Sequence, residues 1–200
     1  MKVGVAPAFS AKIPGSPAGR ASTHTYNPSF STKRLILRLP AIADFPACRD
    51  VVASPRAAFM GGPHDTAKAW DRFCNDVAQS ALQRLGGLTM TLSGKPFGQV
   101  AVCYGPNCPE PELGWFRFDA AHEGDAAHEG KGFAFKAAST LRDRAPGQRG
   151  LDTIVSHFDP ANLASIRLAT RLGGTLDANA ATPGGAPCLT YRYSAPQEIS

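Results

Sequence analysis

The amino-acid sequence predicts an α/β domain in which helices pack on one mixed sheet. Three observations favour this class. Leucines alternate with Arg34, Ile36 and Arg38 at the start of the domain, as in a strand with one buried face. Gly130 and Gly132 lead directly into a helical pattern of apolar residues. The expected elements follow the order strand, two helices, three antiparallel strands, and then helix, strand, helix and terminal strands.

The chain divides into a tail and a domain. Residues 1–30 are rich in Ala, Gly, Pro, Ser and Thr without periodicity, so we expect a flexible N-terminal tail there and one domain over residues 31–200. The net charge is +5, of which the tail holds +3, because it contains Lys2, Lys12 and Arg20 and no acid. The domain shows no stripe of Lys and Arg interleaved with aromatics, which argues against a nucleic-acid partner.

The cysteines predict a reduced, cytoplasmic protein. Their number is odd and they form no CxxC pair of the kind found in zinc sites; they are Cys48, Cys74, Cys103, Cys108 and Cys188. No apolar run approaches the roughly 20 residues that span a bilayer, so no membrane partner is expected. Pro7, Pro14 and Pro17 interrupt any secretory signal.

The first expected strand begins at Lys33, with its leucines facing the core. Asp44 is placed to cap a short helix that runs to about Ala53. A longer helix is expected over about Thr66–Leu85, with Gly86 ending it. The predicted apolar face of this longer helix consists of Trp70, Phe73, Cys74, Val77 and Ala81.

Three antiparallel strands should come next. The segments Leu88–Leu92 and Phe97–Tyr104 flank the turn Ser93–Pro96, which predicts a hairpin. A proline-rich bend over residues 106–111 then precedes a strand over Glu112–Phe118.

The last part of the domain alternates helix and strand. A helix over Gly132–Arg142 should lead to a strand over Leu151–Phe158. Asp159 then caps a helix that Gly173 ends, and Leu189–Tyr193 forms a last strand.

The turn before the helix at Gly132 is suited to an anion. The N–H groups of a helix's first turn lack partners within the helix and lie at the positive end of its dipole. Gly132 has no side chain that would keep a bound anion at a distance.

Four segments of the chain match a known pattern in order and spacing. They are KRLILRLPAIADFPAC (33–48), PELGWF (111–116), EGKGFA (129–134) and DPANLASIRLATRLG (159–173). Together they resemble the GCN5-related N-acetyltransferase (GNAT) superfamily, and within it the ribosomal-protein N-terminal acetyltransferases of the RimJ/RimL type. The resemblance implies a mixed, mostly antiparallel sheet of about seven strands, splayed between the fourth and fifth, with about four flanking helices and the cofactor in the cleft.

The resemblance also implies how acetyl-CoA is bound. Backbone N–H groups of one loop would hold the pyrophosphate, and the loop comprises Glu129, Gly130, Lys131, Gly132, Phe133 and Ala134. The backbone of Phe116, Arg117 and Phe118 would pair with the pantetheine arm, and Asn162 would contact the same arm. Glu129 departs from the family, which has Gln or Arg at this position, and its carboxylate would repel phosphate.

Two catalytic residues follow from the same resemblance. Glu112 stands at the start of the fourth strand, where several family members carry a carboxylate base; the alternative is a glutamate that faces solvent. Ser165 is the candidate acid beside the sulfur. Ser165 and Asn162 are also residue types favoured for capping at a helix start, which is the alternative for both. Ala169 occupies the position at which many relatives have an acidic Tyr, so that group is excluded here.

The hexapeptide DAAHEG occurs twice, over residues 119–124 and 125–130. One copy alone would give the separation between Glu112 and Gly132 that is usual in the superfamily. We therefore interpret the first copy as an insertion in the loop after the fourth strand. The two His-Glu pairs have no second cluster of ligands in the sequence, so no metal is expected.

Three aromatic or histidine residues have structural alternatives. Trp70 and Phe73 would lie near the acceptor pocket of the family, yet an aromatic stripe at helical spacing is more often core. Residues 59–62 are expected at the mouth of this pocket. His157 ends a buried strand and is expected to be structural.

The sequence thus predicts an acetyl-CoA-dependent N-acetyltransferase that uses direct transfer and no metal. The expected acceptor is a primary amine, either a small molecule or a protein N-terminus, and the protein is expected to be a monomer or homodimer. The alternative is a catalytically impaired acyl-CoA-binding or regulatory protein of the same fold. Glu129, the loop insertion, and Lys136, where the branch often has Glu, favour this alternative.

Overall fold

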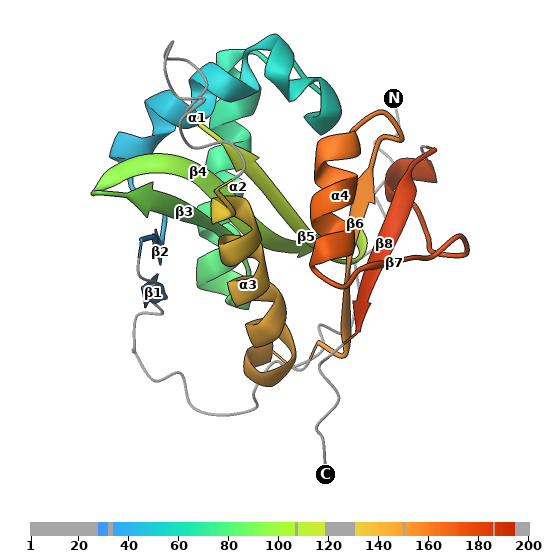
Figure 1. The fold of residues 1–200 in the computed structure, drawn as a ribbon. Helices are drawn as coiled ribbons and strands as arrows, with labels where there is room; N and C mark the ends of the chain where they lie inside the picture. The colour runs from blue at the N-terminus through green and yellow to red at the C-terminus, as the bar shows by residue number, and fades with distance from the viewer. Residues whose placement is uncertain are drawn as a thin grey trace, which may run out of the picture.

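The computed structural model describes residues 28–31, 34–106, 108–118, 131–149, 151–185 and 187–194. In these ranges the chain forms an open eight-stranded sheet with helices on both of its faces (Figure 1). The predicted α/β fold is confirmed, with one more strand than the number expected.

The secondary-structure elements are as follows. The strands are β1 (Ser29–Ser31), β2 (Ile36–Arg38), β3 (Gly86–Leu92), β4 (Lys95–Gly105), β5 (Cys108–Arg117), β6 (Thr153–Phe158), β7 (Thr175–Leu176) and β8 (Leu189–Ser194). The α-helices are α1 (Phe45–Val52), α2 (Thr66–Gln83), α3 (Phe133–Arg149) and α4 (Leu163–Arg171), and a 3₁₀ helix, η2, spans Pro55–Met60. The short strand β1 lies in and just after the segment for which the sequence predicts a tail.

The sheet has the strand order β1-β2-β3-β4-β5-β6-β8-β7. Its neighbouring strands are antiparallel except for β5 and β6, which are parallel and pair at one position, Glu112 with Val155. In Figure 1 the two strands diverge from each other. The splay predicted between the fourth and fifth strands is therefore confirmed, because those strands are β5 and β6.

The main core lies between the sheet and α3, which crosses the front of the sheet in Figure 1. Leu35 and Leu37 are fully buried there, whereas Ile36 between them is 44% exposed, as the alternating pattern predicts. A second, smaller cluster joins α1 and α2; it consists of Cys48, Val51, Val52, Ala69, Phe73 and Phe118.

Helix α2 buries a different face from the predicted one. Its buried residues are Ala69, Phe73, Asp76 and Ser80. Trp70 and Val77 remain 42% and 38% exposed, and Trp70 packs on the rings of Phe45 and Phe73. The prediction from apolar spacing is wrong by about one residue in phase. The helix turns a carboxylate, Asp76, toward the sheet.

The start of α4 also differs from the prediction. Asp159 does not cap the helix; its Oδ1 accepts a hydrogen bond of 2.7 Å from the N–H of Ala161, in a turn that precedes the helix. The N-cap is Asn162, whose Oδ1 accepts from the N–H of Ser165 at 3.2 Å. The observed cap thus lies three positions after the predicted one.

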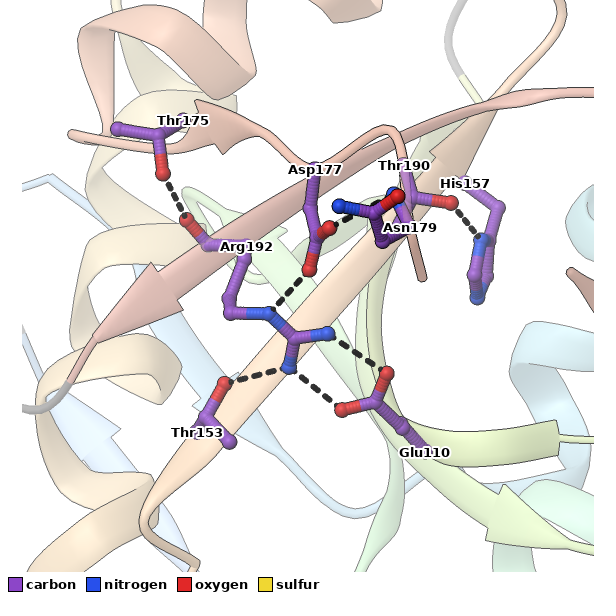
Figure 2. Close-up of polar contacts among 8 residues, drawn as sticks. All are labelled: Glu110, Thr153, His157, Thr175, Asp177, Asn179, Thr190 and Arg192. Carbon is purple, nitrogen blue, oxygen red and sulfur yellow. Dashed lines mark hydrogen bonds and ion pairs between the residues drawn. The ribbon is translucent and has the colours of Figure 1, made fainter. Parts of the chain in front are cut away.

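Strand β5 begins earlier than expected, at Cys108 rather than Glu112. The predicted bend over residues 106–111 therefore contains strand, including Pro109 and Pro111. The extension places Glu110 within reach of Arg192 on β8, across the intervening strand β6, and Arg192 binds its carboxylate through two hydrogen bonds of 2.5 and 2.8 Å (Figure 2).

Arg192 on β8 is the centre of a polar network that links it to β5 and β6 (Figure 2). Besides Glu110 on β5, its guanidinium donates to Asp177 after β7 at 2.8 Å and to Thr153 on β6 at 3.1 Å. Four segments distant in the sequence are joined in this way. The network fixes the strands where they meet and leaves their other ends to diverge.

The five cysteines are free. None of the described helices combines the length and apolar character needed to cross a membrane.

Candidate functional site

Two pockets open where β5 and β6 diverge. The first has a volume of about 600 Å³ and the second about 480 Å³. They share one wall, formed by Phe59, Met60, Trp115, Phe116, Asn162 and Ser165. A molecule in one pocket would therefore meet a molecule in the other at this wall.

The first pocket contains the N-terminal end of α3. Gly132 precedes this helix with φ +76°, and a Cβ added to it would lie in open space. The first hydrogen bond of the helix runs from the N–H of Lys136 to the carbonyl of Gly132 at 2.9 Å. The N–H groups before Lys136 thus have no partner within the helix and point out of its end, as an anion site requires.

Positive charge surrounds this helix end. Among the described residues, the first pocket is lined by four arginines and by no acid; the arginines are Arg56, Arg117, Arg167 and Arg171. Arg167 and Arg171 lie one turn apart on α4, and the guanidinium of Arg171 stacks on the ring of Phe135 at 4.9 Å. From the sequence, Arg117 was predicted to contribute only its backbone, and the other three arginines were not predicted. For Arg167 and Arg171 the helical i, i+4 spacing was the available signal, whereas Arg56 lies on η2 and has no such pattern.

The splay exposes one edge of β5 to the first pocket. The other edge is paired with β4, as in Phe116 with Gln99, while β6 has already turned away. Trp115, Phe116 and Arg117 line the pocket along this edge. Phe118 does not. Its N–H donates to the carbonyl of Phe97 at 2.9 Å, and its ring is buried in the cluster between α1 and α2.

The floor of the second pocket is one face of β4 and β5. On β4 every second residue lines it, namely Gln99, Ala101 and Cys103, whereas on β5 all of residues 112–116 do, with Glu112, Gly114 and Phe116 on the same side of the strand as the β4 residues. The small residues Ala101 and Gly114 are paired in the middle, and a Cβ added to Gly114 would meet nothing within 4 Å. This pair of small residues hollows the floor.

Glu112 lies at the last position where β5 and β6 pair, and it lines the second pocket. Burial raises the pKa of its carboxyl above the ordinary range, while the charge of Arg72 and a hydrogen bond from the backbone N–H of His157 act in the opposite direction. The side chain is thus partly buried and hydrogen-bonded across the splay. The alternative of a solvent-facing glutamate does not describe this position.

A second carboxylate, Asp76 of α2, lines the same pocket and was missed from the sequence. Gln99 Nε2 donates to its Oδ2 at 2.8 Å, and the thiol of Cys103 donates to its Oδ1 at 3.7 Å. Burial raises the pKa of Asp76, opposed by the charge of Arg72 and by the hydrogen bond from Gln99. No sequence motif marks this residue, because it stands among apolar neighbours on a helix.

Asn162 and Ser165 lie in the shared wall. The cap of α4 occupies Oδ1 of Asn162, and its Nδ2 makes no hydrogen bond to another described residue. The hydroxyl of Ser165 is likewise without a hydrogen bond in this part of the structure. The capping alternative is therefore observed for Asn162, and it leaves the amide nitrogen available. Ala169 is fully buried in the core.

The remaining predicted residues divide into three groups. Phe133 and Ala134 line the first pocket with Gly132, whereas Lys131 is exposed beside it. Glu129, Gly130 and the repeat over residues 119–130 lie outside the described residues.

The residues considered for the acceptor pocket differ in whether they line the two pockets. Phe59 and Met60 line both pockets, while Trp70 and Phe73 line neither. His157 lines the second pocket with its Nδ1 2.9 Å from the hydroxyl of Thr190 (Figure 2). No group of three His, Cys, Asp or Glu side chains that could hold a metal occurs among the described residues.

Comparison with known families places this geometry in context. The sequence model of the acetyltransferase (GNAT) domain matches residues 34–175. No curated protein matches the chain. The solved acetyltransferase from Agrobacterium tumefaciens str. C58 is 41% identical, with a TM-score of 0.77 over 88% of this chain and 99% of that one.

Two more distant structures share the fold. RimL, the ribosomal L7/L12 alpha-N-protein acetyltransferase, solved in complex with coenzyme A, is 14% identical with a TM-score of 0.64, over 84% of this chain and 98% of that one. The aminoglycoside acetyltransferase AAC(6')-Ib, also solved with coenzyme A, is 17% identical with a TM-score of 0.64, over 80% of this chain and 94% of that one.

Proposed function

The chain belongs to the acetyltransferase (GNAT) family, and on this basis we propose that it transfers the acetyl group of acetyl-CoA directly to a primary amine. The acceptor is either a small molecule or a protein N-terminus. The transfer proceeds without a metal and without a covalent enzyme intermediate.

One observation carries the proposal: two pockets of opposite charge meet at one wall. The first pocket presents four arginines and a helix N-terminus, which suits the phosphates of CoA. The second presents Glu112 and Asp76 with Arg72 as its one described cation in the lining, which suits an amine. Asn162 and Ser165 stand between them, where an acyl group would pass from one molecule to the other.

The residues of the first pocket fit acetyl-CoA. The open space at Gly132 and the N–H groups that follow it would receive the pyrophosphate, and the arginines would add charge. The exposed edge of β5 from Trp115 to Arg117 would pair with the amides of the pantetheine arm, as a strand pairs with a neighbour. The amide nitrogen of Asn162 would donate to the same arm. When bound, the thioester supplies an activated acyl carbon.

Glu112 is suited to act as the base. An amine attacks only when it is neutral, so its ammonium form must lose a proton first. A carboxylate with a raised pKa accepts that proton more readily than an ordinary glutamate does. The hydrogen bond from the N–H of His157 and the charge of Arg72 act against this rise in pKa and favour the ionised carboxylate that a base requires.

Ser165 is suited to supply a proton on the opposite side of the wall. Its hydroxyl faces the pockets without another described partner, and α4 fixes its backbone through the cap to Asn162. A hydroxyl at this place donates to a departing thiolate, directly or through water.

The test measures free thiol released from acetyl-CoA in the presence of a panel of primary amines, together with CoA binding by calorimetry. Thiol release that requires both substrates supports the proposal. Arg167→Gln and Arg171→Gln should weaken CoA binding, whereas Arg49→Gln, which changes an arginine outside both pockets, should not. Binding of CoA without any transfer would instead indicate an acyl-CoA-binding protein, and absence of binding would refute both functions.

A further inference from the structure

The second pocket is lined by a buried pair of polar side chains, Asp76 on α2 and Gln99 on β4, to which the proposed mechanism assigns no proton transfer. Asp76 is 5% exposed and Gln99 is 2% exposed. The hydrogen bond from Nε2 of Gln99 to Oδ2 of Asp76 fixes which way the amide points, because its oxygen would be repelled by the carboxylate. Oε1 of Gln99 is consequently left without a hydrogen-bond partner among the described residues.

The pair occupies space next to Gly87, which has no side chain. A Cβ added to Gly87 on β3 would lie 2.0 Å from Nε2 of Gln99 and 3.0 Å from Cβ of Asp76. The first distance is a clash and the second is unusually short, so a side chain at this position would force the amide of Gln99 to move. The arrangement is packed tightly.

The polar groups that line this part of the pocket are mainly acceptors. The carboxylates of Asp76 and Glu112 accept, and so does the unpaired Oε1 of Gln99. Their described cationic neighbour is Arg72, whose guanidinium lies over the ring of Phe116 at 5.5 Å. Two carboxylates against one guanidinium favour a ligand that is positively charged and rich in N–H donors.

The two carboxylates occupy separate places. Cys103 pairs with Glu112 across β4 and β5, and its thiol contacts Oδ1 of Asp76 at 3.7 Å. One side chain therefore stands between them. A buried carbonyl with no donor is costly, so Oε1 of Gln99 marks the place where a ligand's N–H group would be stabilising.

We propose that the acceptor carries a second cationic N–H donor group, which Asp76 and Gln99 bind while the reacting amine lies at Glu112. The pair then selects diamine-like acceptors over monoamines. This inference rests on the proposed function, because it takes Glu112 as the reacting end.

The experiment compares 1,4-diaminobutane with n-butylamine as acceptors, by kcat/KM at saturating acetyl-CoA. The wild-type protein should prefer the diamine by about 10-fold or more, since a hydrogen bond to a charged group is worth at least that much. Asp76→Asn, which keeps the shape and removes the charge, should abolish the preference through KM. Asp71→Asn removes the same charge from an exposed position on the same helix and should retain the preference.

Folding and CoA binding of each variant are checked by melting temperature with and without CoA. Equal kcat/KM for the two amines in the wild-type protein overturns the inference, and this result does not depend on any variant. An Asp76→Asn variant that slows both amines equally also overturns it, because the residue is then structural. If CoA binds but neither amine reacts, the inference is wrong while cofactor binding stands. If CoA does not bind, the proposed function itself has failed.

Discussion

The hydroxyl of Ser156 donates a hydrogen bond of 2.5 Å to the carbonyl of Leu113, next to the last paired position of β5 and β6. The hydroxyl of Tyr193 donates in turn to Ser156 at 3.1 Å. The side chain of Ser156 thus links β6 to β5 where the two strands no longer form a backbone pair. The divergence of the strands thus begins at a defined place, next to Glu112.

Ser156→Ala should destabilise the protein by about 1–3 kcal/mol, because it leaves the buried carbonyl of Leu113 and the hydroxyl of Tyr193 without their partner. Chemical denaturation measures the change. Ser139→Ala removes a hydroxyl that bonds a carbonyl on the surface of α3, and should change stability by less than about 0.5 kcal/mol. Equal effects of the two substitutions would show that the bridge contributes nothing specific.

Substitutions at Gly132 should separate charge from backbone conformation. Both Asp and Asn tolerate the left-handed conformation at φ +76° better than other residues do. Gly132→Asp should abolish the increase in melting temperature caused by CoA, since its charge faces the pyrophosphate. The wild-type increase corresponds to about 2.7 kcal/mol at a CoA concentration of 100 times the Kd. Gly132→Asn should retain part of it, and an equal loss in both variants would exclude electrostatic repulsion as the cause.

The pH profile of turnover should identify the base. Because burial raises the pKa of Glu112, activity should fall as the pH decreases through that pKa, where the carboxyl becomes protonated. Glu112→Gln should lower turnover by about 100-fold or more and flatten this acidic limb.

Ser165→Ala should flatten the alkaline limb of the same profile and leave CoA binding nearly intact. Losses under about threefold in both the Ser165 and Glu112 variants would mean that water or backbone handles the protons.

Arg192→Gln should destabilise the protein in a pH-dependent way. The hydrogen bonds from Arg192 hold the pKa of Glu110 below its ordinary value. The stabilisation is therefore present above the unfolded-state pKa, about 4.3 for Glu, and is lost as the pH falls through the lower folded-state pKa. We expect a deficit of about 2 kcal/mol at pH 7 that shrinks in acid, as measured by denaturation at several pH values.

Arg49→Gln provides the control for this prediction. Its ion pair with Asp50 is exposed, with 40% and 51% of the two side chains accessible, so its loss should have little effect at any pH. A deficit of Arg192→Gln that persists unchanged in acid would mean that the arginine stabilises the sheet by packing instead.

Deletion of residues 119–124 should leave a folded protein that binds CoA, if the first DAAHEG copy is an insertion. Loop closure entropy changes slowly with length, so the shorter loop costs little. Thermal melts with and without CoA measure both properties. Loss of CoA binding in the deletion, with binding kept in Glu129→Gln, would show that the first copy and not the second forms the phosphate loop.

Local patterns predicted the fold well where one interaction dominates. The alternation around Leu35 and Leu37 and the hairpin turn at Ser93 and Gly94 each follow from burial or backbone conformation alone. The order of the four family segments along the chain predicted which two strands lie on either side of the splay. Glu112 was found in this way, although its hydrogen bond across to β6 was not.

Other features depend on tertiary contacts that no local pattern contains. The face of α2 was assigned from its apolar residues, but the sheet offers Gln99 as a partner for Asp76 and so rotates a carboxylate inward. Both Asp159 and Asn162 are capping residues, and the sequence does not decide which of them begins the helix. Pro109 and Pro111 suggested a bend because proline lacks an N–H, yet β5 includes both.

Within the described residues, both edges of the sheet end in very short strands, β1 with three residues and β7 with two. A long unpaired edge offers a row of free N–H and C=O groups to other chains and promotes aggregation. The splay leaves a further unpaired edge in the interior of the described sheet, along β5, and the proposed use of that edge is to hold the cosubstrate. Under the proposed function, this interior edge pairs with a small molecule, while the short strands at the periphery limit the chance of non-native association.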